Sequence, residues 1–180
     1  NIMIQRDLYL QKIIDYMWDG QIKVITGIRR AGKSTLLFAV FYDYLLKKSV
    51  KAENIIKLQL DKRKDSKYRN PIVLAEYVEN QVSKSKEKFY LFIDEIQFCY
   101  SVPDPDNEGY EITVYDMLNE LKDYKNLDVY VTGSNSKMLS KAISTEFRGP
   151  SSQIHVYPLS FSELHATKGG DKRDNFDSYM

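Results

Sequence analysis

The stretch that most constrains the fold of this chain is residues 22–37, which read IKVITGIRRAGKSTLL. Residues 27–34 match the pattern G-x-x-x-x-G-K-[ST], which is typical of a loop that binds phosphate. An apolar, β-prone run precedes the match and a helix-like run follows it, so the pattern has the strand–loop–helix setting that such a loop needs. The alternative is a chance match in a turn rich in Gly and Lys, and this setting disfavours it.

Each part of the predicted loop has a chemical reason. Gly27 and Gly32 let the backbone turn tightly and bring its N–H groups close to anionic oxygens. The helix that begins near Gly32 points its positive end at the same place. Lys33 adds a cation for the β- and γ-phosphates, and the Ser34 hydroxyl is placed to bind Mg²⁺. The expected phosphate-binding set is Gly27, Arg30, Ala31, Gly32, Lys33, Ser34 and Thr35.

Composition bounds the class of protein. The 180 residues suit one domain, or one domain plus part of another. The hydrophobic share of 43% is enough for a sizeable core, and a net charge of +1 creates no global field that would attract nucleic acid or a membrane. The single cysteine, Cys99, excludes an internal disulfide and a zinc site built on cysteines, which fits a cytoplasmic setting. No apolar run approaches the ~18 residues of a membrane helix.

Apolar periodicity predicts helices and strands in alternation along the chain. This order implies an α/β fold with a parallel sheet that helices cover on both faces. We expect residues 1–158 to form a core domain and residues 159–180 to begin a lid or linker. Strands are expected at 22–26, 54–60, 89–93, 127–132 and 153–157. Helices are expected at 6–18, from the phosphate loop to about 47, from 71 onward with Asn70 as N-cap, at 112–124 and at 136–143, with loops at 61–69 and 97–110.

A second motif follows the third expected strand. Residues 89–93 form a short apolar run, typical of a strand that is buried on both faces, and Asp94 and Glu95 follow at once. Such a pair is the Walker B pattern, in which Asp94 would hold Mg²⁺ opposite Ser34 and Glu95 would orient and deprotonate a water. The alternative is a strand that ends in surface carboxylates. A Glu directly after the Asp, and the absence of an N-K-x-D motif, argue against a small GTPase.

Polar residues after the fourth expected strand, and one later arginine, complete the candidate set. Asn135, then Ser134, then Thr132 are the candidates for a sensor that touches the γ-phosphate or the water, and capping of the next helix is the alternative for each residue. Arg148 precedes the last strand, where a guanidinium could stabilise phosphate charge on a neighbouring subunit. A surface arginine is the alternative there.

The segments GIRRAGKST, YLFIDEIQ, DVYVTGSNSKMLS and IHVYPLSFSEL, in this order, resemble the AAA+ type ATPases of bacteria and archaea. The likeness is greatest to the group in which a second C-terminal domain of poorly defined function follows the ATPase domain, and it covers residues 6–168. The resemblance implies a three-layer P-loop NTPase fold of the ASCE type, with a five-stranded parallel sheet in the order 5-1-4-3-2. It also implies ATP and Mg²⁺ as ligands.

The resemblance assigns roles to particular residues. Lys33 and Ser34 become the phosphate and Mg²⁺ residues, Asp94 and Glu95 the Walker B pair, and residues 134–135 the sensor region. The family often has an arginine at position 150, where this chain has Pro150, so only Arg148 is left as an arginine finger. The helical lid that should follow residues 158–161 is missing, so we expect this chain to be a fragment of a longer protein.

Two functions from different classes follow. One is a Mg²⁺-dependent ATPase that drives a remodelling event, weak in this fragment. The other is a nucleotide-gated interaction or signalling module with little turnover. The expected partners are ATP or ADP and, in the full-length protein, further copies of the chain, with no membrane. The basic residues of loop 61–69 could touch nucleic acid, but Asp61 and Asp65 dilute their charge, so a solvated loop is the preferred interpretation.

Overall fold

The computed structural model describes residues 2–134 and 137–158, and its centre is a five-stranded parallel sheet. The strand order is β2-β3-β6-β1-β7, which confirms the predicted α/β fold and the predicted order 5-1-4-3-2 once the five strands are numbered along the chain. The strands are β1 (Lys23–Gly27), β2 (Ile55–Gln59), β3 (Phe89–Asp94), β6 (Leu127–Ser134) and β7 (Ser152–His155).

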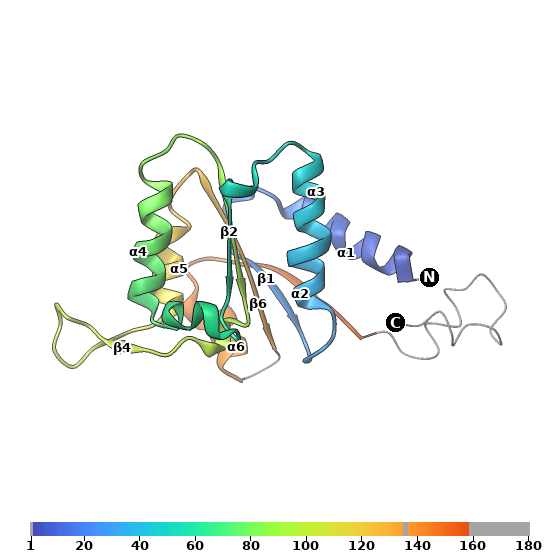
Figure 1. Cartoon of the computed structure of the whole chain (residues 1–180). Helices are drawn as coiled ribbons and strands as arrows, with labels where there is room; N and C mark the ends of the chain where they lie inside the picture. Colours follow the sequence, from blue (N-terminus) through green and yellow to red (C-terminus); the bar gives the residue numbers. More distant parts are fainter. Residues whose placement is uncertain (1, 135–136, 159–180) are drawn as a thin grey trace.

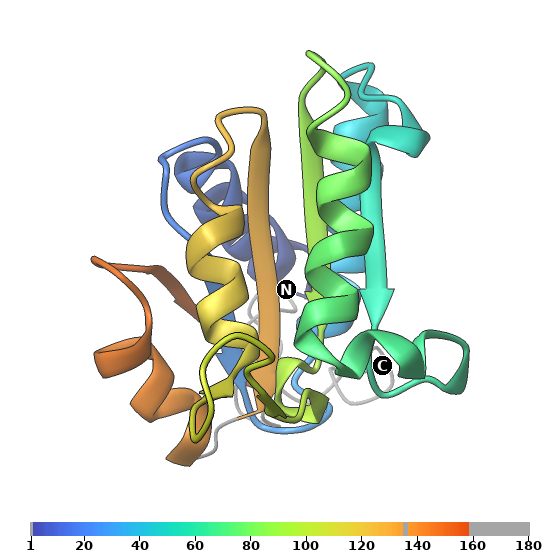
Figure 2. The ribbon, with the colours of Figure 1, turned by 90° about the vertical axis from the view of Figure 1, so that its left-hand side faces the viewer.

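Helices cover both faces of this sheet, which gives the three layers seen in Figure 1. One face carries α1 (Ile2–Tyr16) and the run formed by α2 (Lys33–Thr35), the π-helical η1 (Leu36–Phe41) and α3 (Tyr42–Lys47). The other face, turned toward the viewer in Figure 2, carries α4 (Pro71–Val82), α5 (Val114–Leu121), α6 (Lys137–Lys141) and the π-helical η5 (Ala142–Glu146).

The sheet separates two hydrophobic cores because neighbouring strand residues point to opposite faces. In β1, Val24 packs into the core under α4 and α5, while Ile25 packs into the core under α1 and α3. Phe41 is the centre of the second core, with its ring centroid 5.0 Å from that of Tyr130 and 5.6 Å from that of Phe92. Because both faces are covered, β3 is buried along its whole length, as its continuous apolar sequence predicts.

Two helices begin where local chemistry favours a start. The Asn70 side chain accepts hydrogen bonds from the N–H groups of Ile72 and Val73, and Pro71 occupies the first helical position, so the predicted start of α4 is confirmed. Thr113 and Asp116 form a reciprocal capping box at the start of α5.

Two segments expected as loops contain regular structure. Within 61–69, residues Arg63–Arg69 form the 3-10 helix η3, where the Asp65 carboxylate accepts the N–H of Gln59 at 2.8 Å. Within 97–110, the chain forms η4 (Ile96–Phe98) and enters a two-stranded hairpin of β4 (Val102–Pro103) and β5 (Glu111–Ile112). These elements are held by local polar contacts rather than by an apolar period, so the periodicity could not predict them. A further 3-10 turn, η2 (Ala52–Asn54), precedes β2.

Candidate nucleotide-binding site

The phosphate loop leaves β1 at Gly27 and enters α2 at Lys33, at the edge where the carboxyl ends of the parallel strands meet (Figure 1). Gly27 lies so close to β7 that a Cβ built on it would be 2.4 Å from the carbonyl oxygen of Val156. Gly32 precedes the helix with φ 97°, a left-handed conformation that glycine adopts without strain. The two glycines that the pattern requires therefore serve different purposes. Gly27 allows the close approach to the strand beside it, and Gly32 allows the left-handed turn before the helix.

Lys33 is folded over this loop rather than extended into solvent. Its side chain is only 4% exposed, and Nζ donates to the carbonyl oxygens of Gly27 at 2.9 Å and Ile28 at 2.8 Å. Burial lowers the pKa of the Lys33 ammonium, and the charges of Glu95 and Asp94 partly offset this by raising it. The loop thus holds one buried cation, bonded to neutral carbonyls that a phosphate oxygen would replace as stronger partners.

Asp94 ends β3 and faces the loop with a side chain that is 3% exposed. Burial raises the pKa of the Asp94 carboxyl, hydrogen bonding from Thr132 and Ser34 lowers it, and the charge of Asp61 raises it further. Ser34 and Asp94, which the sequence predicts on opposite sides of a Mg²⁺ ion, line the same cavity. A hydroxyl and a carboxylate are oxygen ligands of the kind that Mg²⁺ prefers, so this pair fits the ion.

Glu95 adopts a left-handed backbone conformation, φ 56° and ψ 59°. For a non-glycine residue this conformation is unusual and costs free energy, and such residues cluster at functional sites. Its N–H donates to Thr132 Oγ1 at 2.9 Å, and its carboxylate oxygen Oε2 accepts from Gln97 Nε2 at 3.0 Å. The turn directs the Glu95 carboxylate to the same cavity as Lys33.

These residues surround a cavity of about 340 Å³. Seven of the predicted residues line it: Arg30, Gly32, Lys33, Ser34, Thr35, Asp94 and Glu95. Four further lining residues lie outside the predicted set: Arg29, Gln59, Asp61 and Lys62. Two predicted residues lie just outside: Gly27 bonds to Lys33 through its carbonyl, and Ala31 packs against the core below α1 and α3.

The end of β2 contributes Gln59, Asp61 and Lys62 because β2 lies beside β3 in the sheet. Gln59 is paired with Asp94 in the register of the two strands, and the Leu60 N–H bonds to the Asp94 carbonyl at 3.2 Å. A general rule could have found them: the carboxyl ends of parallel strands meet at one edge of the sheet, so residues that follow any of its strands are site candidates.

Of the three sensor candidates, Thr132 is the one for which the described part of the chain shows hydrogen bonds to Asp94 and Glu95. It is fully buried and bonds to both residues of the Walker B pattern. Ser134, the last residue of β6, is half-buried, and Asn135 lies outside the described residues. The sequence places Thr132 last of the three, because it does not show that the β3–β6 register, with Ile93 beside Val131, brings Thr132 next to Asp94.

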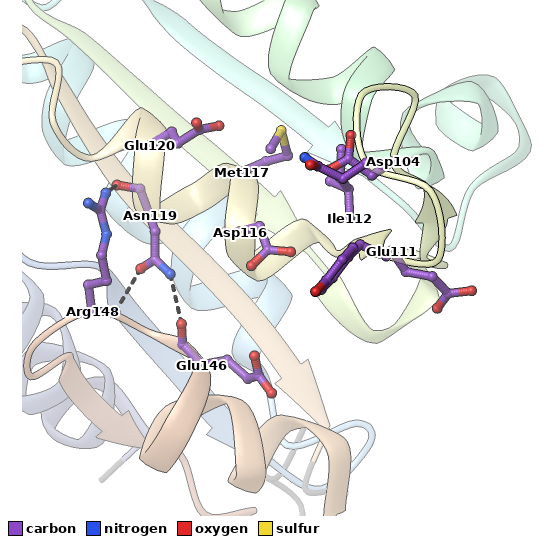
Figure 3. A pocket seen from close by; sticks show the side chains of 11 residues that line it. Asp104, Glu111, Ile112, Asp116, Met117, Asn119, Glu120, Glu146 and Arg148 are labelled. Atoms are coloured by element: carbon purple, nitrogen blue, oxygen red, sulfur yellow. Dashed lines mark hydrogen bonds between the residues drawn. The ribbon is translucent and has the colours of Figure 1, made fainter.

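Arg148 lies away from this cavity, in a second hollow of about 790 Å³ between α5, the β4–β5 hairpin and residues 146–148 (Figure 3). Its guanidinium donates to the backbone carbonyl of Asn119 and to Asp123 Oδ2 at 3.0 Å, and its own N–H donates to Asn119 Oδ1 at 2.8 Å. The structure does not bring Arg148 to the phosphate loop of its own chain. Its role toward a neighbouring subunit stays a prediction.

The chain matches the model of an AAA domain family over residues 19–165. It belongs to this AAA domain family. An uncharacterized protein of Haemophilus influenzae is 37% identical over 165 residues, and an uncharacterized protein of Methanocaldococcus jannaschii is 32% identical over 166 residues. These matches cover 91% and 90% of this AAA domain but only 38% and 31% of the relatives, so the chain spans about a third of the length of the curated relatives it matches.

Solved structures share the fold of this AAA domain. C. elegans PCH-2 superimposes with a TM-score of 0.55 at 12% identity, covering 91% of this chain and 42% of that one. A chain of the Drosophila ORC complex with AT-rich DNA and Cdc6 gives a TM-score of 0.53 at 14% identity, covering 88% and 57%. At these identities the likeness shows the fold alone, a parallel five-stranded sheet with helices on both faces. Among the helices that the structure describes, none has the length and apolarity needed to cross a membrane.

Proposed function

We propose that this AAA domain binds ATP with Mg²⁺ and hydrolyses it. The observation that carries the proposal is the meeting of one buried cation, Lys33, with Ser34, Asp94 and Glu95 around one cavity at the end of the parallel sheet. Catalysis of phosphoryl transfer depends mainly on positioning the reacting groups and on charges that stabilise the phosphates, and these four residues can supply both.

Each residue has a proposed task. Lys33 exchanges its bonds to the loop carbonyls for the β- and γ-phosphate oxygens, and the N–H groups at the start of the α2–η1 run face the same anion. Ser34 and Asp94 hold Mg²⁺, which supplies charge neutralisation to the phosphates when it is bound. Glu95 orients a water and accepts its proton. Arg29, Arg30 and Lys62 add positive charge at the rim of the cavity.

A nucleotide-gated module with little turnover is the second candidate, and one observation favours it. Arg148, the predicted second cation of the reaction, is bonded to α5 and lies in a different hollow. Without a neighbouring subunit that supplies a guanidinium, Lys33 and the rim cations alone would stabilise the phosphate charge. Assembly of the full-length protein is therefore part of the hydrolysis proposal, and turnover that rises with protein concentration would support it.

Nucleic acid is not part of the proposed function. The Drosophila ORC structure is of a complex bound to DNA, but two cations of segment 61–69 are engaged inside this chain. Arg69 donates to the Leu60 carbonyl at 2.7 Å and stacks over Phe98, and Lys64 lies 3.6 Å from Asp65. A phosphate backbone would have to compete with these contacts.

Calorimetry with ATP and Mg²⁺ tests the proposal. Replacing the cation in Lys33→Ala should weaken ATP binding by about 1.5 to 3 kcal/mol, since the bond it removes joins two charged groups. Lys47→Ala is the matched control, because Lys47 is exposed at the end of α3 and pairs with Asp43. Equal ATP affinity of the unchanged chain and Lys33→Ala would overturn the binding proposal. Phosphate release over time then separates an ATPase from a nucleotide-gated module.

A further inference from the structure

We infer that Gln97 is a positioning residue for the reaction: it holds the Glu95 carboxylate and links that carboxylate to the end of β6. The inference deepens the proposed function and rests on it for the role of Glu95. Gln97 lies in η4, directly after the left-handed Glu95, and its Nε2 donates to Glu95 Oε2 at 3.0 Å. The left-handed turn is what lets a side chain two residues ahead reach back to the carboxylate.

The other end of the same amide is unsatisfied. Gln97 Oε1 is buried and has no hydrogen-bond partner among the residues that the structure describes. A buried, unpaired carbonyl oxygen destabilises a fold, and an apolar side chain of similar size would fill the same space without that penalty. Stability of the domain therefore does not explain an amide at position 97. The donor that the amide supplies to Glu95 does.

The unpaired oxygen faces the backbone of β6 at Gly133. A Cβ built on Gly133 would lie 3.3 Å from Gln97 Oε1 and 2.5 Å from Leu139 Cδ2, so the amide fits here because position 133 has no side chain. Gly133 follows Thr132, whose hydroxyl accepts the Glu95 N–H. β6 thus touches Glu95 by two routes: the Thr132 hydroxyl accepts the Glu95 N–H, and Gly133 lies against the Gln97 amide that bonds to the Glu95 carboxylate. A shift of this strand end would therefore move the carboxylate.

A donor on a carboxylate oxygen fixes the orientation of that group, so removing it should leave the Glu95 carboxylate free to rotate within the cavity. The charged groups that line the same cavity stay unchanged in the test variant, so their contribution cancels in the comparison. They are Arg29 and Arg30 of the phosphate loop, Lys33 of α2, Asp61 and Lys62 after β2, and Asp94 of β3.

The test is Gln97→Leu, which keeps the approximate size and removes the donor, with Gln97→Met as a second apolar variant should Leu fail to fold. Gln81→Leu is the matched control, because the Gln81 amide bonds only to the Tyr77 carbonyl on its own helix. NMR relaxation of the ¹³C-labelled Glu95 side chain, assigned with Glu95→Gln, needs no nucleotide. We expect its order parameter to fall toward that of a freely rotating side chain, below about 0.6, in Gln97→Leu and to stay in place in Gln81→Leu.

Two further measurements separate positioning from structural support. The thermal unfolding temperature of Gln97→Leu should equal or exceed that of the unchanged chain, because the variant removes a buried unpaired oxygen. ATP turnover should fall on the order of 10-fold while ATP affinity is unchanged. An unchanged Glu95 order parameter in both apolar variants would overturn the inference, as would a loss of stability with no change in that order parameter. Failure of the unchanged chain to bind ATP would instead overturn the proposed function.

Discussion

The Thr132 hydroxyl donates to Asp94 Oδ1 across 2.6 Å, and both side chains are almost fully buried, at 0% and 3% exposed. The same oxygen accepts the N–H of Glu95 at 2.9 Å. A hydroxyl has one donor and two acceptor positions, so one side chain can satisfy both groups at once. Thr132 therefore fixes the proposed metal ligand, Asp94, and the proposed base, Glu95, relative to each other. It does so from β6, whereas Asp94 ends β3 and Glu95 follows it.

The first prediction concerns this hydroxyl. Thr132→Val keeps the shape of the side chain but removes the Thr132 donor from Asp94 and leaves the Glu95 N–H without its acceptor. We expect the free energy of unfolding to fall by about 1 to 3 kcal/mol, the usual cost of such unpaired groups. Because Asp94 then loses its fixed orientation, the gain in ATP affinity that Mg²⁺ brings should shrink, as measured by calorimetry with and without the ion.

Thr26→Val is the control for that experiment. Thr26 lies one residue before the end of β1, but its hydroxyl bonds to His155 Nδ1 at 3.0 Å, outside the Walker B pair. We expect this variant to retain the effect of Mg²⁺ on ATP affinity. If both valine variants lose the Mg²⁺ effect equally, the loss comes from general loosening of the sheet rather than from the Thr132 contacts.

The second prediction separates binding from chemistry. Glu95→Gln keeps the size of the side chain and an oxygen that Gln97 can bond to, but an amide cannot accept a proton from water. ATP should still bind with Mg²⁺, while phosphate release should fall by about 10²-fold or more. Equal rates of phosphate release from the two proteins would remove Glu95 as the base, and lost ATP binding would show that Glu95 acts before chemistry.

The sequence predicted the parts of the site that lie within one continuous motif. The spacing of Gly27, Gly32 and Lys33 follows from the geometry of a single loop, and Asp94 with Glu95 follows from the end of one buried strand. The sheet order could be expected as well, because the resemblance of four separate segments to one fold implied it. These predictions needed no knowledge of which side chains touch across the sheet.

The contacts made across strands could not be predicted in the same way. Thr132 reaches Asp94 only because of the β3–β6 register, and Gln97 reaches Glu95 only because Glu95 is left-handed. The β3–β6 register and the left-handed φ of Glu95 depend on the packing of the whole domain, so a local sequence pattern does not predict them. Arg148 is the opposite case. Its position in the sequence suggests a role at the phosphates, but in the structure its side chain bonds to α5.

The third prediction concerns stability against pH. Burial raises the pKa of Asp94 above its ordinary value of 3.8 in the folded chain, so the folded state holds this proton more tightly than the unfolded state does. Stability from this group is therefore present at low pH and is lost as pH rises from about 3.8 through the raised folded value. Asp94→Asn should be more stable than the unchanged chain at pH 7, without nucleotide, and this difference should vanish below pH 3.8. Urea unfolding at a series of pH values measures it, and a pH-independent difference would contradict it.

The fourth prediction concerns the close approach at Gly27. A methyl group there would lie 2.4 Å from the Val156 carbonyl oxygen, on a backbone with φ 154°. The backbone of β7 would have to move, so Gly27→Ala should lower the free energy of unfolding by about 1 to 3 kcal/mol, as overpacking does, and should weaken ATP binding. Gly109→Ala is the control, since Gly109 also has positive φ but has no neighbouring atom within 4 Å of a built Cβ. Equal losses of stability in the two variants would assign the effect to φ rather than to the collision.

The last prediction concerns a buried ion pair at the opposite end of the strands. Lys23 is fully buried and its ammonium donates to Asp128 Oδ1, to Asp19 at 2.9 Å and to the Gln21 carbonyl at 2.9 Å. Lys23→Met leaves the Asp128 carboxylate buried with only neutral donors, and breaking such a pair costs about 3 to 5 kcal/mol of unfolding free energy.

Adding Asp128→Asn to Lys23→Met removes the uncompensated charge, so the double variant should recover a large part of the lost stability. Urea unfolding of both variants measures this, and a double variant as unstable as Lys23→Met alone would show that packing, not the charge, sets the cost. ATP affinity should stay unchanged in the double variant, because the pair lies at the amino ends of β1 and β6 and the phosphate loop at the carboxyl end of β1.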